Sequence, residues 1–480
     1  MTGVSPFDKD ITEYMIETTT DKNGKKRTIY TPVNARCGAQ DYLKTITHNN
    51  TLYFFQPLTG LYEENKGSIE SWFQRQFEIL LDNGDLPRSM PLKKHITELI
   101  YQLRIAKVWE DEEHYPFNQY NGIPVNNGVL VFDGEGFDLI PYTEDMLFTR
   151  KLPINYNPAA DTTRIKRILQ DWLEDEYPFL LQIPAQALMQ SLPGYQPAKK
   201  AYILIGEANA AKSTYLDLLR DFFGVRCCSK LSLQNIGLRF AASELVGKFV
   251  NLGDDLPDVK VGAFTILKDF TGGRTHQVEE KHKKQYTADI TAVHVYAANK
   301  PPGLEVNVEN DNAWWDRWIF LRFQNTFPKK PNWYKLNITP NMEGFLLLVL
   351  EELAMILKHD GELQHDQLID DVMDMWKHAS SPLLVFLEEE TDRGRDNHIP
   401  KEELFAALTK WVADIPDRLE REETEKRIPK TLTALSKSLI QLGIETTTSG
   451  SRKNKIQVYR GIGWKATSRY KPRETVNAKL

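Results

Sequence analysis

The chain has few cysteines, no long apolar run and no large excess of charge of either sign. Its three cysteines, Cys37, Cys227 and Cys228, form neither a disulfide framework nor a metal-binding spacing, which indicates a reducing compartment. The ten histidines are scattered without a metal motif. No apolar stretch approaches the ~20 residues of a transmembrane helix, so we expect no membrane span. These absences exclude a secreted disulfide-stabilised domain and an integral membrane protein as classes.

The sequence also lacks a targeting signal and a strong net charge. Residues 1–8 have neither the basic nor the apolar region of a signal peptide, so we expect an intracellular protein. The net charge of −6 excludes a globally basic nucleic-acid coat, and any contact with nucleic acid would have to be local. What remains is an ordinary globular composition, with 41% hydrophobic and 26% charged residues. A length of 480 residues allows roughly two to four domains.

The most informative stretch is a small-residue loop between an apolar run and an amphipathic segment. Residues 201–205 are apolar and residues 215–223 have apolar positions at helical spacing, which predicts a strand, a loop and a helix. Such a loop points its backbone N–H groups at phosphate oxygens, and the helix dipole adds to the attraction. We therefore predict a nucleotide-binding site formed by Gly206, Glu207, Ala208, Asn209, Ala210, Ala211, Lys212, Ser213 and Thr214.

Two side chains of this loop have assigned roles. Lys212 is expected to reach the β- and γ-phosphates, and the Ser213 hydroxyl to bind Mg²⁺, so the predicted cofactors are ATP and Mg²⁺. The glycine that usually precedes the lysine is Ala211 here. Alanine at a positive φ costs on the order of 1 kcal/mol, which lowers the site's quality without excluding it. Taken alone, a chance turn of small residues is the alternative.

Paired carboxylates follow a second apolar run at 248–253. Hydrolysis of a phosphoanhydride needs one carboxylate to hold hydrated Mg²⁺ and a second group to orient or deprotonate the attacking water. We assign Asp254 to the metal and Asp255 to the water, in an order that the sequence leaves open. A solvated Asp-Asp turn before Pro257 is the alternative.

Two further apolar runs each have a single polar residue at one end. The apolar residues 292–298 are followed by Asn299, whose amide at a strand tip could position the attacking water. Arg317 precedes the apolar half of the aromatic segment 311–323, where an arginine could act on a neighbouring subunit's nucleotide as an arginine finger. The alternatives are a turn signal at Asn299 and a surface arginine beside Asp316.

Four short motifs, in this order along the chain, resemble those of the superfamily 3 DNA helicases of the phage, plasmid and poxvirus primase-helicase type. The motifs are Gly-x-x-x-x-Ala-Lys-Ser at 206–213, Gly-Asp-Asp-Leu-Pro-Asp at 253–258, Thr-Gly-Gly at 271–273 and Ala-Asn-Lys-Pro at 298–301. They cover about residues 200 to 325, and the likeness is weaker on either side.

The segment 267–286 has the most specific likeness. Lys268 precedes Thr-Gly-Gly, and in that family a β-hairpin follows that points into a ring channel. Lys281 and His282 also resemble the Lys-His pair at the hairpin tip of the polyomavirus large T antigen. A basic tip suits a moving contact with a DNA backbone. The expected DNA-binding residues are Lys281, His282, Lys283 and Lys284; a solvated charged face is the alternative.

The resemblance implies an AAA+ ATPase ring, a hexamer, that translocates on single-stranded DNA as ATP is hydrolysed between subunits. It assigns nucleotide and metal binding to Lys212 and Ser213, the acidic pair to Asp254 and Asp255, the sensor to Asn299 and the finger to Arg317. The chain departs from the family pattern at Ala208 and Ala211, where glycine is common, and at Asn209, one place earlier than the usual asparagine. The MCM replicative helicases also have alanine before the P-loop lysine.

The predicted fold is α/β, with an AAA+ P-loop ATPase core, a mixed α+β N-terminal domain and a C-terminal winged-helix domain. Its parts are a polar segment (1–35), a pre-helicase or oligomerisation domain (36–195), the AAA+ domain (196–378), a winged-helix-like domain (379–466) and a basic tail (467–480). The expected elements before the tail are a hairpin turn at 21–24, helices at 68–81, 95–104 and 342–357, strands at 123–132 and strand-like structure through 148–153.

The C-terminal part predicts three helices and a basic hairpin. The helices are at 383–390, 402–411 and 430–443, with an acidic linker between the second and third, and the strands are at 444–448 and 455–459. A basic wing suits phosphate contacts, so we expect Arg452, Lys453 and Lys455 to bind DNA. Wings also serve as protein contacts, and a disordered tail is the alternative after about residue 466.

The leading hypothesis is an ATP-dependent helicase that replicates a virus, phage, plasmid or other mobile element, in the cytoplasm of a prokaryote or of the host cell. Its expected partners are single-stranded and forked DNA and further copies of itself. Residues 36–195 contain no histidine with paired acids at strand-like spacing, so a primase would have to lie outside this chain; the sequence leaves open whether a separate primase or polymerase is needed. The alternative is an ATP-switched replication initiator or loader. A non-DNA AAA+ machine leaves the hairpin unexplained.

Overall fold

The computed structural model describes residues 5–109, 116–254, 264–273, 275–280, 285–302, 311–416, 418–449 and 455–471. Seven predicted site residues lie outside the described residues: Asp255, Lys281, His282, Lys283, Lys284, Arg452 and Lys453. Residues 472–480 of the predicted tail also lie outside. The chain divides into two compact units, Met1–Asn299 with Leu304–Gln367 and Lys300–Gly303 with Leu368–Leu480. The five-part division made from the sequence stays a prediction.

The first unit opens with the predicted hairpin. β1 (Ile16–Thr20) pairs antiparallel with β2 (Lys26–Tyr30). The Asp21 carboxylate closes the turn by accepting hydrogen bonds from the backbone N–H groups of Asn23 and Lys25, each 2.9 Å long. A short polar side chain that satisfies the turn's own backbone is the reason aspartate is frequent at such positions.

Two predicted helices form the core of the N-terminal layer. α3 (Ser68–Asp82) and α4 (Leu92–Ala106) bury Trp72, Phe77 and Leu99 in one apolar cluster, as their helical spacing predicts. The other elements of residues 5–109 are η1 (Pro6–Asp8), α1 (Thr12–Met15), α2 (Pro32–Tyr42), β3 (Thr45–His48), β4 (Thr51–Gln56) and β5 (Leu61–Glu64).

A small antiparallel sheet follows, of β6 (Ile123–Val125), β7 (Gly128–Phe132) and β8 (Phe137–Ile140). The first two strands confirm the prediction for 123–132. The strand-like structure expected through 148–153 is wrong, because that stretch is irregular apart from single backbone hydrogen bonds. Arg150 turns inward with its guanidinium 4.0 Å from the centre of the Phe249 ring, and Pro153 has no N–H to donate to a ladder.

The centre of the first unit is a parallel five-stranded sheet, which confirms the α/β class. Its strand order is β10-β11-β14-β9-β15, and the order along the chain differs, so the strands are joined by crossovers. The strands are β9 (Ala201–Gly206), β10 (Cys228–Ser229), β11 (Val250–Gly253), β14 (Val293–Ala298) and β15 (Trp318–Phe323). The AAA+ assignment of this core stays a prediction.

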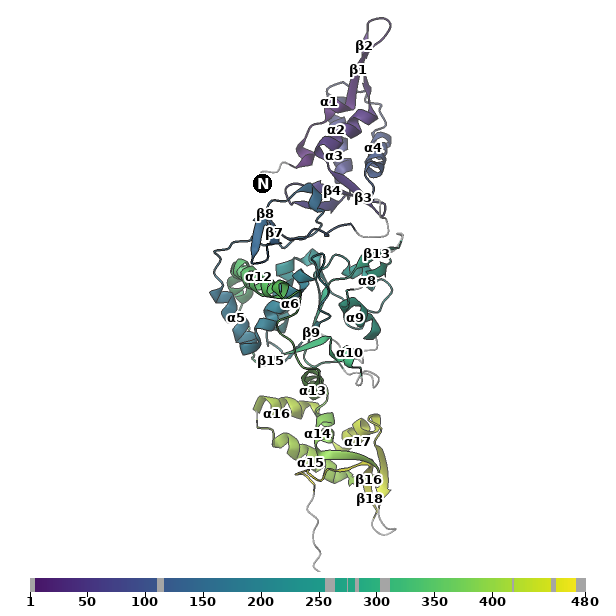
Figure 1. Ribbon diagram of the computed structural model, residues 1–480. Helices are drawn as coiled ribbons and strands as arrows, with labels where there is room; N and C mark the ends of the chain where they lie inside the picture. Colours follow the sequence, from purple (N-terminus) through teal and green to yellow (C-terminus); the bar gives the residue numbers. More distant parts are fainter. Residues whose placement is uncertain are drawn as a thin grey trace, which may run out of the picture. The chain divides into compact units, whose positions relative to one another are not determined.

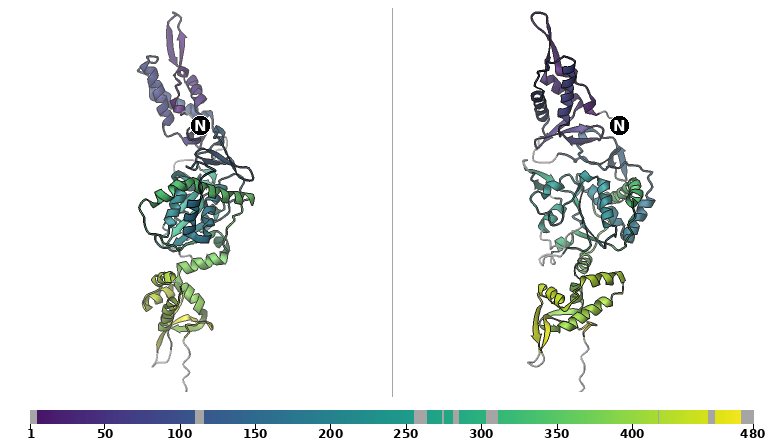
Figure 2. Two further views of the ribbon diagram at one scale, coloured as in Figure 1. Left: turned by 90° about the vertical axis from the view of Figure 1, so that its left-hand side faces the viewer. Right: turned by 180° about the vertical axis from the view of Figure 1, so that it is seen from behind.

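Helices cover both faces of the sheet (Figure 1). On one face α5 (Thr163–Leu173), α6 (Pro178–Met189), α7 (Lys212–Phe223) and α12 (Met342–Lys358) share the largest apolar cluster with the strands. The view from behind in Figure 2 shows the same two layers with their sides exchanged. α12 confirms the helix predicted at 342–357.

The opposite face packs against α8 (Ala241–Leu245), α9 (Phe264–Thr271) and α10 (Asn312–Trp315) (Figure 1). Phe270 of α9 stacks near His294, and Trp314 of α10 meets Trp318 edge-on at 5.2 Å between ring centres. The remaining elements of this unit are η2 (Glu144–Met146), η3 (Glu174–Glu176), η4 (Val225–Cys227), β12 (Thr275–Val278), β13 (Tyr286–Asp289), α11 (Trp333–Asn337) and η5 (Thr339–Asn341).

The second unit has helices around a three-stranded antiparallel sheet of order β16-β18-β17. Its elements are α13 (Ile369–Ser380), α14 (Pro382–Glu390), β16 (Thr391–Pro400), α15 (Lys401–Ala413), α16 (Arg418–Arg427), α17 (Leu432–Gln441), β17 (Glu445–Ser449) and β18 (Ile456–Trp464). The predicted helices at 383–390, 402–411 and 430–443 and the two predicted strands are confirmed. The winged-helix interpretation stays a prediction.

Two features of the second unit differ from the sequence prediction. The prediction of an acidic linker between the second and third helices is wrong, because helix α16 lies there. Within α16, Arg418 and Glu422 form a 2.9 Å ion pair one turn apart. β16 was not predicted, because its polar residues show no apolar alternation.

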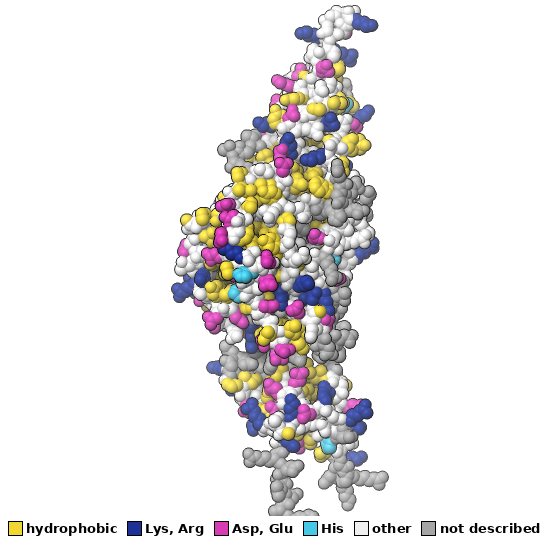
Figure 3. All heavy atoms as spheres, viewed as in Figure 1, with side chains coloured by type: hydrophobic (Ala, Val, Ile, Leu, Met, Phe, Trp, Pro, Cys, Tyr) yellow, Lys and Arg dark blue, Asp and Glu magenta, His cyan; other side chains and the backbone are white. Residues whose placement is uncertain are grey.

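The charge distribution agrees with the modest net charge. Acidic and basic side chains are interspersed on the face shown in Figure 3. None of the helices that the structure describes combines the length and apolar character needed to cross a bilayer.

Candidate nucleotide-binding site

The loop between β9 and α7 begins at a glycine that the neighbouring strand requires. A Cβ on Gly206 would lie 2.4 Å from the carbonyl oxygen of Phe323 in β15. Because both backbones are held in the sheet, neither can move away, so only glycine fits. α7 begins at Lys212, and residues 207–211 therefore form the loop.

Two loop residues that are not glycine have a left-handed backbone. The φ angles are 67° at Asn209 and 72° at Ala211. Ala211 thus adopts the conformation for which glycine is usual, at a cost on the order of 1 kcal/mol. Left-handed residues in such a loop turn successive N–H groups to one side and form an anion-binding concavity. The first turn of α7 adds further N–H groups and the helix dipole, so the loop fits a phosphate chain.

The Lys212 side chain lies within this loop, and its residue is 8% exposed. The ammonium group donates to the carbonyl oxygens of Gly206 at 2.5 Å and Glu207 at 2.8 Å, and to the Asn299 side-chain oxygen at 3.3 Å. These three acceptors hold the charge at the concave side of the loop. A phosphate bound there would offer the same ammonium stronger, charged acceptors.

Sheet topology explains why Lys212, Asp254 and Asn299 meet. Asp254 follows β11, Asn299 follows β14 and the Lys212 loop follows β9, and these three strands are neighbours that run parallel. Their carboxyl ends therefore lie at one edge, where open α/β sheets bind ligands. The structure thus brings Lys212 and Asn299, and Ser213 and Asp254, together at this edge, and the roles assigned to them stay predictions.

The metal side of the site has suitable ligands. The Ser213 hydroxyl donates to the Asp254 carboxylate at 3.4 Å. A hydroxyl and a carboxylate are hard oxygen ligands of the kind that Mg²⁺ prefers, with water and phosphate oxygens completing its coordination. The residues present therefore fit a hydrated Mg²⁺ bound with a nucleotide. The second carboxylate, Asp255, lies outside the described residues.

Arg317 is not brought to this cluster. It precedes β15, and its carbonyl oxygen accepts a 2.6 Å hydrogen bond from the N–H of Ala201, the first residue of β9. Because Trp318 pairs with Ala201 and Phe323 with Gly206, Arg317 lies at the amino edge of the sheet. The length of β9 separates that edge from the loop, about 20 Å at ~3.3 Å per residue. Arg317 cannot reach a nucleotide bound to its own loop.

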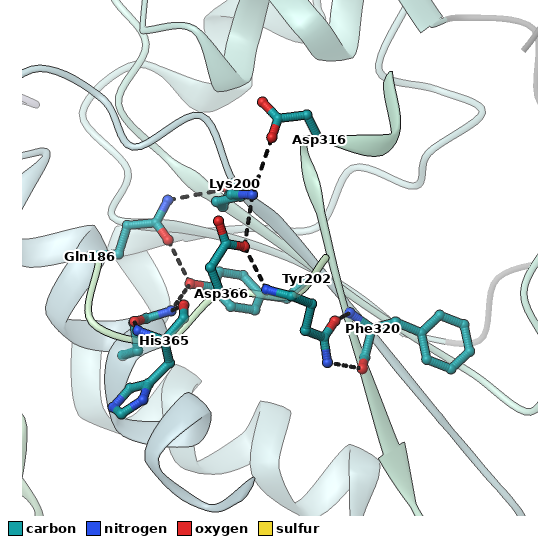
Figure 4. A network of polar contacts seen from close by, with 9 residues as sticks. Gln186, Lys200, Tyr202, Asp316, Phe320, His365 and Asp366 are labelled. Carbon is teal, nitrogen blue, oxygen red and sulfur yellow. Dashed lines mark hydrogen bonds and ion pairs between the residues drawn. The ribbon is translucent and has the colours of Figure 1, made fainter. Parts of the chain in front are cut away.

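The amino edge holds a charged network that the sequence did not predict (Figure 4). Lys200, whose residue is 9% exposed, pairs with Asp366 at 2.8 Å and with Asp316 at 3.6 Å. The alternative that paired Arg317 with Asp316 is not supported, because the ion partner of Asp316 is Lys200. No local motif signals this network, since Asp366 is distant in sequence and lies after α12.

Two amide side chains fix the segment that contains Asp366 (Figure 4). Gln182 exchanges two hydrogen bonds with the backbone of His365, at 2.7 and 2.8 Å. Gln367 does the same with the backbone of Phe320, at 2.7 and 2.9 Å. β15 is an edge strand, so Gln367 satisfies backbone groups that would otherwise be open to pairing.

A buried polar group lies midway along the strands. His294 is fully buried, and its Nδ1 is 3.2 Å from the Asn251 amide nitrogen, which donates to it. Burial lowers the pKa of His294 to about 3, so the imidazole is neutral in the folded protein. The Asn251 amide oxygen accepts from Ser229 at 3.0 Å, which links three adjacent strands.

The vicinal cysteines offer no reactive thiol. Cys227 and Cys228 form no disulfide with each other or with Cys37. Burial raises the pKa of both thiols, that of Cys228 to about 12. A thiol with so high a pKa is protonated at neutral pH and is a poor nucleophile. Both thiols therefore pack as small apolar side chains.

Comparison with known proteins gives one family match and a set of similar structures. A domain family of unknown function, DUF5906, matches residues 204–317, the range from the middle of β9 to Arg317. No curated protein matches the chain.

Three of the similar structures are of the C-terminal region of NrS-1. An A form apo structure is 14% identical with a TM-score of 0.44, over 87% of this chain and 96% of that one. An apo structure is 14% identical with a TM-score of 0.43, over 88% and 96%. A further A form apo structure is 15% identical with a TM-score of 0.44, over 88% and 97%. A likeness of this degree does not identify a function.

Proposed function

We propose that this protein is an ATP-dependent DNA helicase of the superfamily 3 type, with an AAA+ ATPase core. One observation carries the proposal: Lys212, Asp254 and Asn299 meet at a loop whose backbone fits a phosphate. Hydrolysis of ATP needs a cation on the phosphates, oxygen ligands for Mg²⁺ and a group that positions water. All three kinds of group are present at this edge of the sheet.

Each residue then has one task. Lys212 leaves its carbonyl acceptors and binds the β- and γ-phosphates. Ser213 and Asp254 would hold Mg²⁺, which would supply positive charge to offset the negative charge on the transferred phosphoryl group. Asn299 orients the attacking water, and Asp255 accepts its proton. The loop backbone surrounds the phosphates without using further charged side chains.

The separation of Arg317 from the loop supports a site shared between subunits. An arginine at the opposite edge of the sheet can stabilise the transition state only when it belongs to a neighbouring copy of the chain. A closed ring in which each subunit offers its amino edge to the next one satisfies this requirement at every site. We propose a hexamer, as the resemblance implies.

The proposed DNA contacts come from two hairpins. β12 and β13 pair antiparallel from Thr275 opposite Asp289 to Val278 opposite Tyr286, so the segment with Lys281 to Lys284 connects the strands of a hairpin. Its basic residues suit a contact with single-stranded DNA. Lys455, next to β18, is exposed and suits a second phosphate contact together with Arg452 and Lys453.

An ATP-switched initiator or loader is the second candidate, because it would use the same ATP site and the same hairpin. It would grip DNA without moving along it. The helicase is preferred because hydrolysis coupled to a hairpin that follows Thr-Gly-Gly is what the resemblance implies.

The experiment measures the ATPase rate of the full chain with and without single-stranded DNA, together with strand displacement on a forked duplex. Stimulation by DNA with ATP-dependent displacement is the expected result. Hydrolysis without displacement would favour the initiator or loader. An absence of hydrolysis at saturating Mg²⁺ and ATP would overturn the proposal.

A further inference from the structure

The Thr-Gly-Gly motif contains a side chain that contacts Arg317. Thr271, the last residue of α9, is buried, and its hydroxyl oxygen accepts a 3.1 Å hydrogen bond from Nε of Arg317. The hydroxyl has one proton, which it donates at 2.7 Å to the carbonyl oxygen of Leu267 one turn earlier. The hydroxyl orientation is therefore fixed by its own helix, and a lone pair is directed at the arginine.

Arg317 is also supported by α10, and Lys268, one turn before Thr271 on α9, contacts the residue that caps that helix. The Lys268 ammonium forms an ion pair with the Asp311 carboxylate, which holds the pKa of Asp311 below its usual range. Asp311 also caps α10 by accepting from the N–H of Trp314 at 3.2 Å. The carbonyl oxygen of Ala313 in α10 in turn accepts from Nη1 of Arg317. The guanidinium group is thus held by both helices, which lie side by side (Figure 1).

The hairpin strand β12 begins at Thr275, four residues after the end of α9 at Thr271. Gly272 closes the helix through its N–H, which donates to the Lys268 carbonyl oxygen at 3.1 Å. Gly273 has a φ of 58°, and a Cβ there would lie 1.9 Å from Cγ of Pro197. Gly273 is therefore packed against a proline close to the end of α9. A shift of the hairpin would be transmitted to the end of α9, where Thr271 lies.

We propose that Thr271 is a positioning residue for Arg317, and that through it DNA bound at the β12–β13 hairpin sets the orientation of the arginine offered to the neighbouring subunit. The inference rests on the proposed function. The threonine of Thr-Gly-Gly then has a defined role, because its hydroxyl couples DNA binding at the hairpin to the orientation of the Arg317 guanidinium. It also explains why the finger and the hairpin share one short helix as their support.

The test compares Thr271→Val, which keeps the shape and removes the hydroxyl, with Thr271→Ser, which keeps the hydroxyl. Thr271→Val should lower the DNA-stimulated kcat about tenfold, the effect expected for losing one hydrogen bond to a charged group. Nucleotide affinity and the melting temperature should stay near wild type. Thr271→Ser should restore at least half of the stimulated rate.

Mixing Thr271→Val subunits with Lys212→Ala subunits distinguishes a positioning role of Thr271 from damage to the nucleotide site. Thr271→Val subunits keep an intact loop, and Lys212→Ala subunits keep a correctly held Arg317, so mixed rings should hydrolyse ATP faster than either variant alone. A wild-type stimulated rate in Thr271→Val would overturn the inference. So would an equal loss in Thr271→Ser, or a loss of nucleotide affinity that mixing does not rescue. Failure of the wild-type chain itself to hydrolyse ATP would instead overturn the proposed function.

Discussion

The two edges of the central sheet differ in how they are assembled. At the carboxyl edge, Asp254 and Asn299 directly follow strands and Lys212 follows β9 after a five-residue loop, and three neighbouring parallel strands bring them together. At the amino edge, Lys200 is held by Asp316 and Asp366, which come from segments far apart in the chain. The comparison teaches that strand ends at one edge form a site by topology alone, whereas the other edge depends on distant side-chain contacts.

Removing the cation of the carboxyl edge should have the largest effect. Lys212→Ala should abolish ATP hydrolysis, because it removes the ammonium group that contacts the loop carbonyls and Asn299. A steady-state ATPase assay measures this. Lys230→Ala, which removes an exposed lysine, is the matched control and should retain the wild-type rate. Normal turnover in Lys212→Ala would show that the loop is not the nucleotide site.

Removing the arginine of the amino edge should lower turnover without weakening binding. Arg317→Ala should reduce kcat by about 10³-fold, the range known for arginine fingers. Nucleotide affinity should change little, because Arg317 lies at the far edge from its own loop. Fluorescent-nucleotide titration and the ATPase assay together separate the two quantities. Equal losses in affinity and kcat would contradict the division between the edges.

His294, midway along the strands between the two edges, should make the free energy of unfolding depend on pH. The pKa of His294 is about 3 in the folded protein against 6.5 when unperturbed, so the unfolded chain takes up the proton first. The stability is complete above pH 6.5 and is lost as pH falls from 6.5 toward 3. Between pH 7.5 and 5 the loss should be about 2 kcal/mol. Urea unfolding of wild type and His294→Leu measures it, and an equal loss in the variant would refute the assignment.

The network at the amino edge should contribute less, because its carboxylates are half-exposed. Asp366→Asn should lower the free energy of unfolding by about 1 kcal/mol, since it weakens the closer pair with the buried Lys200. Asp316→Asn should cost less, because its separation from Lys200 is longer, 3.6 Å against 2.8 Å. Urea unfolding of the two variants compares them. The reverse order would indicate that Asp316 is the main partner.

Relieving the backbone of the loop should have the smallest effect. Ala211→Gly should stabilise the fold by up to about 1 kcal/mol, less the entropy that glycine adds to the unfolded chain. Ala210→Gly is the matched control: Ala210 is buried without a positive φ, so this change should destabilise. Thermal unfolding distinguishes the two. Destabilisation by both would mean that the Ala211 conformation carries no strain.

Sequence reasoning reached the carboxyl edge because its signals are local. Asn299 directly follows an apolar run and Lys212 follows one after a short small-residue loop, and a parallel sheet makes such positions meet. The amino edge has no such local signal, because Lys200 and Asp366 are far apart in sequence and only the tertiary fold brings them together. The role of Thr271 was equally hidden, because the sequence does not show that α9 lies against Arg317.

The errors elsewhere have the same origin. Residues 148–153 have strand-forming composition, but Arg150 packs over Phe249 instead of alternating outward. α16 is almost wholly charged, so it has no apolar stripe to reveal a helix. β16 pairs with β18 through polar residues, with an irregularity between Arg393 and His398. At residues 148–153 and in β16 a tertiary contact outweighs the local pattern, whereas α16 is supported by the local pair of Arg418 and Glu422.

The most direct test of the account mixes Lys212→Ala and Arg317→Ala subunits, each inactive alone, after subunit exchange has been demonstrated by fluorescence energy transfer. A site completed between two copies predicts that the mixture hydrolyses ATP, because some interfaces combine an intact loop with an intact arginine. Complete inactivity of an exchanging mixture would contradict the shared site and return Arg317 to a structural role.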